Sequence, residues 1–163
     1  MKFEELLSNK IIIKLVETEK SDYLKFFENT YKDNLRTAYD NLKKHPRWTI
    51  ISGYYAMHDL AKFFLAKQFS LKINKRVHIA TIICLEEVLK DKKLKDEITK
   101  LLEKAENIFS TNITRYLEKG KREREKVQYY NFKTDFSQIT DNASHFIEDV
   151  VNPFIKIVER LLK

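Results

Sequence analysis

Hydrophobic residues recur at intervals of three and four positions along most of the chain, as they do on the buried face of an α-helix. This pattern predicts a first long helix that begins with Ser21 as its N-cap and ends by the pair His45-Pro46, because the residue before a proline avoids the helical region. The same spacing predicts further helices from about Arg47 to Phe69, from Lys75 to Lys90, from the charged patch Asp91–Lys93 towards Gly120, and from about Asp135 to Lys163. Residues 1–20 are expected to form a short helical or irregular lead, and Ser70 to Asn74 to be a connector.

Residues that break regular structure are rare in this chain. Its 163 residues include two glycines and two prolines, whereas average usage would give about 20 in total. A β-sandwich or barrel needs turn residues every 8–12 positions or so, and a phosphate-cradling loop needs clustered glycines. The sequence therefore predicts an all-α fold: one domain over residues 1–163, built as an antiparallel bundle of four to five main helices with no sheet beyond a stray bridge.

Two breakers fall inside the predicted helices. Gly120 can end the fourth helix, or the helix can continue through it and project a charged turn. Pro153 lies inside the last helix, where it is expected to kink the helix or to mark a break near Val150.

The helix predicted over Arg47–Phe69 is apolar around most of its circumference, which is typical of the central helix of a bundle. Such a helix must be covered on every side. A homodimer is therefore expected, with this helix and the region Lys119–Phe132 near the interface.

The charge balance is basic, with 31 Lys and Arg against 24 Asp and Glu and a net charge of +7. A small basic domain favours anionic partners, of which nucleic acid is the commonest, although a solvated basic face has the same composition. The first residues carry acids and no long apolar stretch, so neither a signal peptide nor a membrane span is expected, and the predicted location is the cytoplasm. Cys84 lies in an apolar run and is expected in the core.

A basic run followed by aromatic residues is the main candidate for nucleic-acid binding. Cations for phosphates and rings for base stacking are provided by Lys121, Arg122, Arg124, Lys126, Tyr129 and Tyr130. The interleaved Glu123 and Glu125 leave open a second interpretation, in which the arginines form ion pairs on a solvated or dimer-facing surface.

The spacing of the four histidines gives no metal signature. His45, His58, His78 and His145 include no two that are three or four residues apart, so no metal and no cofactor is expected. His58 lies on the apolar helix after two tyrosines, where it is either a core histidine with satisfied hydrogen bonds or part of a functional site.

Three segments resemble the HEPN superfamily of small helical bundles. They are "SGYYAMHDLAKFFLAKQF" at Ser52–Phe69, "KINKRVHIATIICL" at Lys72–Leu85, and "REREKVQYY" at Arg122–Tyr130. The resemblance implies a helical bundle that pairs as a homodimer. It also implies a place among proteins of toxin–antitoxin, CRISPR and defence systems, many of which are ribonucleases or are partnered by a minimal nucleotidyltransferase.

The chain departs from the motif of the catalytic members, which is Arg, four to six residues, then His. Arg36 precedes His45 by nine positions and Arg76 precedes His78 by two, and no other arginine comes closer to the required spacing. The expected function is therefore a HEPN-like module that binds RNA or a nucleotidyltransferase-type partner and lacks the usual nuclease dyad. The alternatives are a metal-independent ribonuclease with a rearranged site, for which His58, Arg122 and Arg124 are the candidates, and a purely structural interaction domain.

Overall fold

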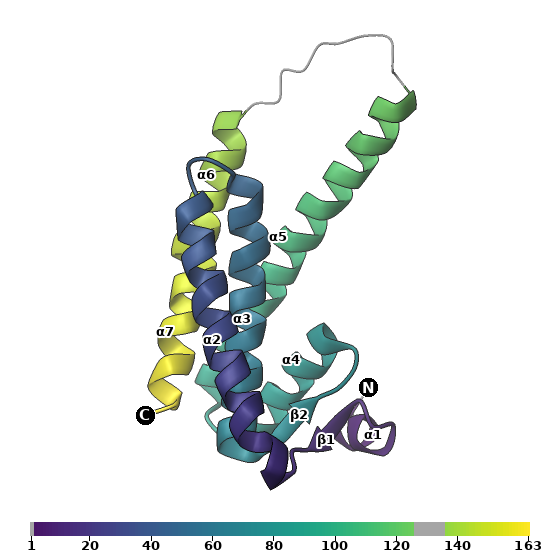
Figure 1. The fold of residues 1–163 in the computed structure, drawn as a ribbon, viewed down its shortest axis with the longest axis vertical. Coiled ribbons are helices and arrows are strands. Elements are labelled where there is room, and N and C mark those ends of the chain that lie inside the picture. Colours follow the sequence, from purple (N-terminus) through teal and green to yellow (C-terminus); the bar gives the residue numbers. More distant parts are fainter. Residues whose placement is uncertain (1, 126–135) are drawn as a thin grey trace.

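The computed structural model describes residues 2–125 and 136–163 and shows an all-α bundle with one small sheet (Figure 1). In chain order its elements are α1 (Phe3–Ser8), β1 (Ile12–Lys14), α2 (Glu17–Asn41), α3 (Pro46–Phe69), β2 (Leu71–Ile73), α4 (Val77–Val88), α5 (Lys92–Glu125), α6 (Phe136–Phe146), a π-helical turn η1 (Ile147–Val151) and α7 (Asn152–Leu161). The predicted fold class is confirmed.

Helices α2 and α3 form an antiparallel hairpin that makes the most extensive contact in the bundle. As predicted, the break falls at His45-Pro46: α2 ends at Asn41, and Pro46 is the first residue of α3, where its missing N–H costs nothing. The buried Thr49 hydroxyl closes the hairpin by donating to the carbonyl oxygen of Ala38 at 2.8 Å. The predicted start of α2 is wrong, because the helix begins at Glu17 rather than Ser21, with acidic residues in its first turn that favour a helix N-terminus.

Helix α3 is the central helix, in agreement with its apolar circumference. It packs against α2, α4, α5, α6, η1 and α7, so one chain already covers most of its surface. The closest approach is at Gly53, where an added Cβ would lie 3.1 Å from both Phe146 and Val151. A larger residue would push α3 away from the C-terminal helices. Only some α3 side chains, including Trp48, Tyr55 and Phe69, remain exposed.

The last predicted helix is one continuous rod with an irregular turn in the middle. The π-helical turn Ile147–Val151 lies directly before Asn152 and Pro153, which begin α7. A proline removes one helical N–H and its ring crowds the carbonyl four residues earlier, so the wider turn accommodates it there. The irregularity predicted near Val150 is therefore a π-helical turn within a continuous helix and not a break.

The small sheet goes beyond the stray bridge that the sequence predicted. Strands β1 and β2 pair antiparallel over three residues, with Ile12 opposite Ile73 and Lys14 opposite Leu71. Three-residue strands are too short for an alternating pattern to show, which is why this part of the lead and of the connector was expected to be irregular. The sheet forms because α2 and α3, with 25 and 24 residues, return the chain to the level at which the hairpin began.

Two further expectations concern burial and hydropathy. Cys84 is fully buried on α4, as expected, and burial raises the pKa of its thiol to about 12. Within residues 2–125 and 136–163, no helix has both the length and the apolar character that crossing a membrane requires.

Candidate functional site

The basic run lies at the end of α5. This helix continues through Gly120 to Glu125, so Lys121, Arg122 and Arg124 belong to its final turns. The first half of α5 packs in the bundle, and its last turns diverge from the neighbouring helices (Figure 1). The remaining predicted binding residues, Lys126, Tyr129 and Tyr130, lie outside the described residues.

His58 lies on α3 with only 2% of its surface exposed. Tyr54 precedes it by one helical turn, and the two rings meet edge to face with centroids 4.6 Å apart. The Tyr54 ring is also stacked on Phe109 of α5, at 4.0 Å and an interplanar angle of 13°. These contacts fix the face of α3 that points towards α4 and α5.

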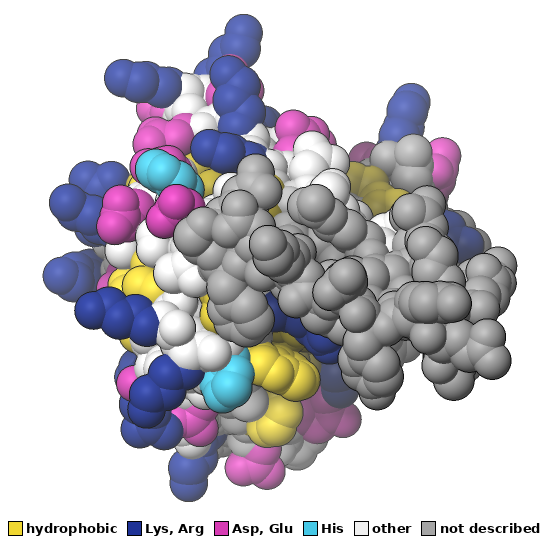
Figure 2. Space-filling view, turned by 90° about the horizontal axis from the view of Figure 1, so that it is seen from above, with side chains coloured by type: hydrophobic (Ala, Val, Ile, Leu, Met, Phe, Trp, Pro, Cys, Tyr) yellow, Lys and Arg dark blue, Asp and Glu magenta, His cyan; other side chains and the backbone are white. Residues whose placement is uncertain are grey.

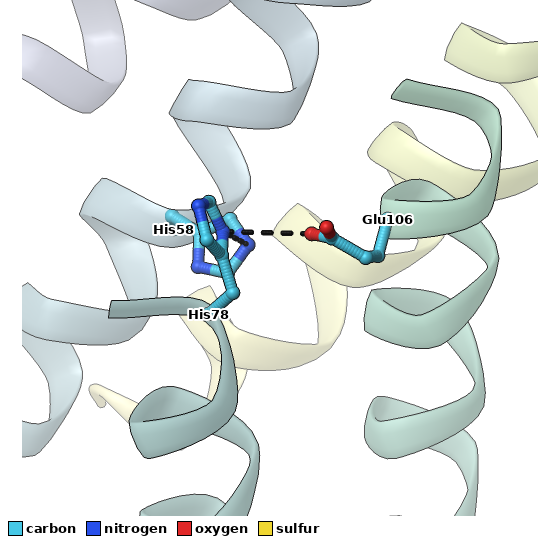
Figure 3. A group of neighbouring side chains, drawn as sticks. All are labelled: His58, His78 and Glu106. Atoms are coloured by element: carbon cyan, nitrogen blue, oxygen red, sulfur yellow. Dashed lines mark hydrogen bonds and ion pairs between the residues drawn. The ribbon is translucent and has the colours of Figure 1, made fainter. Parts of the chain in front are cut away.

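Two side chains from other helices complete a polar cluster around His58 (Figure 3). The chain turns from β2 into α4 through Arg76 in a left-handed conformation, which brings His78 onto the first turn of α4. His78 Nδ1 lies 3.4 Å from His58 Nε2 and 3.5 Å from the Oε2 atom of Glu106 on α5. The Tyr54 hydroxyl donates to Glu106 Oε2 and is also hydrogen-bonded to His78 Nδ1.

Burial sets the protonation of this cluster. Burial, with smaller contributions from His78 and Lys62, lowers the pKa of His58 to about 3, so its imidazole is neutral at physiological pH. Burial and the Glu106 carboxylate raise the pKa of Tyr54 well above its usual range, so its hydroxyl keeps its proton. His58 Nδ1 has no hydrogen-bond partner among the described residues. His78 and Glu106 are the accessible side of the cluster, with 45% and 38% of their side-chain surfaces exposed.

The structure does not bring His58 together with the two arginines that were its candidate partners. The cluster contacts α5 at Glu106, and Arg122 follows sixteen residues later in the same continuous helix. At ~1.5 Å per residue, about 24 Å separates these positions along α5. Within one chain, His58 and Arg122 or Arg124 therefore do not form a common site.

Sequence reasoning singled out His58 but missed His78 and Glu106. It tested histidine spacing within single helices, whereas these three side chains come from α3, α4 and α5. The one available signal was the i, i+4 placement of Tyr54 and His58, which puts two polar groups on one face of an otherwise apolar helix.

A groove of about 370 Å³ lies between α5 and the segment formed by α6 and η1. Its polar lining residues include Lys104, Asn107, Asn112, Asn142 and His145. It provides amide and lysine hydrogen-bond donors, together with the carboxylate of Asp149.

Comparisons of the chain with models of known protein families, with curated proteins and with solved structures found no match. The HEPN resemblance stays a prediction from the sequence. The chemistry of the site is thus defined by its own residues: a polar cluster able to hold a proton network or a metal ion, and a basic helix end.

Proposed function

We propose that the protein is a HEPN-like helical module that binds RNA as a homodimer in the cytoplasm, within a toxin–antitoxin or defence system, without the Arg-x(4–6)-His nuclease dyad. The observation that carries the proposal is the position of Lys121, Arg122 and Arg124 in the final turns of α5, where the helix diverges from the bundle. A helix end that leaves the bundle is a place where cationic residues of the sequence could meet a phosphate backbone.

The groove between α5 and α6 supports the same proposal. Three asparagines, a lysine and a histidine line it together with Asp149, and such amide and cationic side chains are able to hydrogen-bond to unpaired bases and phosphates. An RNA strand held by the end of α5 would run towards this groove.

The described surface at this end of the molecule carries both signs of charge. In Figure 2, Lys and Arg side chains spread around the rim, with Asp and Glu between them. A general electrostatic attraction over the whole face is therefore a weaker source of affinity than a local cationic segment.

The experiment measures binding of fluorescent single-stranded RNA by anisotropy at several salt concentrations. The double variant Arg122→Ala/Arg124→Ala should bind more weakly, and its salt slope should fall by about 0.7 for each phosphate that the variant no longer neutralises. The matched control is Lys92→Ala/Lys93→Ala, which removes the same charge from exposed positions at the other end of α5. It should bind like the wild type.

Each other outcome favours a different function. Equal losses in both double variants would contradict a local RNA site. RNA affinity unchanged per folded dimer, with dimers that dissociate or melt early, would favour a structural interaction domain. Cleavage of the RNA in the presence of a chelator would favour the metal-independent ribonuclease. No RNA binding by the wild type, with capture of a minimal nucleotidyltransferase, would favour the protein partner.

A further inference from the structure

Two distances in the polar cluster of α3, α4 and α5 are long for hydrogen bonds, and the Tyr54 hydroxyl lies between two of its atoms, bonded to both His78 Nδ1 and Glu106 Oε2. His78 Nδ1 is 3.4 Å from His58 Nε2 and 3.5 Å from Glu106 Oε2, whereas hydrogen bonds from ring nitrogens are commonly about 2.9–3.0 Å long. Two imidazole nitrogens and a carboxylate oxygen nevertheless converge, and all three lie within 4.8 Å of one another. Polar atoms from three separate helices meet here in the wall of an apolar core.

These distances match the edges of a metal coordination shell. Zinc–nitrogen and zinc–oxygen bonds of about 2.0–2.1 Å place neighbouring ligand atoms of a tetrahedron about 3.4 Å apart. The two distances from His78 Nδ1 already have this length. The third pair closes by a rotation of Glu106, whose side chain is long and partly exposed.

We propose that His58, His78 and Glu106 form a binding site for one zinc-type divalent metal ion. Two imidazoles and one carboxylate are three ligands that zinc accepts, and the Tyr54 hydroxyl, which bonds to both His78 Nδ1 and Glu106 Oε2, lies at the fourth position. The ion enters from the side of His78 and Glu106, the exposed members of the cluster. The Tyr54 hydroxyl holds the Glu106 carboxylate near the histidines, because it donates to Glu106 Oε2 and is also hydrogen-bonded to His78 Nδ1.

The test uses the untagged full-length protein, treated with a chelator and titrated with Zn²⁺ in a calorimeter and with Co²⁺ in a visible spectrometer. We expect one Zn²⁺ per chain and a tetrahedral Co²⁺ spectrum. His78→Gln and Glu106→Gln should each weaken binding at least tenfold and abolish that spectrum. Both residues are partly exposed, so these variants remain folded even if changes at the buried His58 do not.

The chain offers a matched control on the C-terminal rod. His145 and Asp149 also form a histidine–carboxylate pair with Nδ1 and Oδ2 3.5 Å apart, but they are exposed and have no second histidine beside them in the described part of the chain. His145→Gln should leave Zn²⁺ affinity unchanged. An equal loss in His145→Gln, or no Zn²⁺ binding by the wild type, would overturn the proposal and leave the cluster as a hydrogen-bond network. Neither result bears on the RNA measurement, because the titrations contain no RNA.

Discussion

Helices α2 and α3 are the two arms of one hairpin, but they differ in how far their charged side chains are exposed to solvent. Each arm carries an ion pair between residues three positions apart: Asp33 with Arg36 on α2, and Asp59 with Lys62 on α3. The pair on α2 is shorter, 2.7 Å against 3.2 Å, but its side chains are 68% and 73% exposed, whereas those of the α3 pair are 11% and 14% exposed. Water screens the first pair and largely leaves the second unscreened, so the longer contact matters more for stability.

The same contrast holds for the apolar residues of the two arms. On α2 only Tyr31 and Ala38 are buried, and Phe26 is exposed. On α3 most side chains are buried, because five other helical elements pack around it in addition to α2. The environment around an arm, rather than its length, therefore determines how much each of its residues contributes to the free energy of unfolding.

The largest expected effect is on thiol reactivity, and it compares a buried residue of α4 with an exposed residue of α2. The thiol of Cys84 is fully buried with a raised pKa, so it should react with an aromatic disulfide at pH 8 at least ~1,000-fold more slowly than an exposed thiol, because reaction requires opening of the core. The comparison is with Lys25→Cys, which puts a second thiol on the exposed face of α2. If both thiols of that variant react with the disulfide at the same rate, the core around α4 is accessible to the reagent.

A deletion of core volume should have the next largest effect. Leu60→Ala on α3 removes a fully buried side chain and should lower the free energy of unfolding by about 3 kcal/mol. Phe26→Ala on α2 removes a larger but exposed side chain and should change it by less than about 0.5 kcal/mol. Chemical denaturation of both variants checks the difference, and equal losses would contradict the burial assigned to the two arms.

The buried ion pair should have an intermediate effect. Asp59→Asn can keep the hydrogen bond from Asn34 but leaves Lys62 without its counter-charge in a nearly buried position, so we expect a loss of about 2 kcal/mol. Asp33→Asn, its counterpart on α2, should cost less than about 0.5 kcal/mol. High salt should shrink only the smaller of the two effects, and a salt-sensitive Asp59→Asn would mean that this pair is solvated.

The hydroxyl that joins the two arms should have the smallest effect. Thr49→Val keeps the shape of the buried side chain and removes its hydrogen bond to Ala38, which should cost about 1 kcal/mol. Thermal unfolding measures this loss. If Thr49→Val unfolds at the same temperature as the wild type, the packing of α2 on α3 holds the hairpin together without this hydrogen bond.

Most of the fold could be predicted because the periodicity of a helix can be recognised within a short stretch of sequence. The boundary at His45-Pro46 and the irregular turn before Pro153 follow from the covalent structure of proline, and the central place of α3 follows from its apolar circumference. Strands β1 and β2 were missed because each has three residues and pairs with a segment remote in the sequence.

The candidate site could be predicted only in part, for a related reason. His58 was visible as a polar residue on an apolar helix, but its partners His78 and Glu106 are placed by how α4 and α5 pack on α3. No pattern within one helix encodes that packing. The basic run was visible in full, since charge is read directly from the sequence, whereas the divergence of the end of α5 from the bundle required the structure.

The near-equal lengths of α2 and α3 also constrain the order in which the chain folds. Strands β1 and β2 are separated by roughly sixty residues, and two three-residue strands are too short to hold so long a loop closed by themselves. They pair only after α2 and α3 have packed together as a hairpin, because this packing places β2 beside β1. Residues 2–15 are therefore expected to dock last during folding and to detach first, and their amide protons should exchange with solvent while those of the hairpin are still protected.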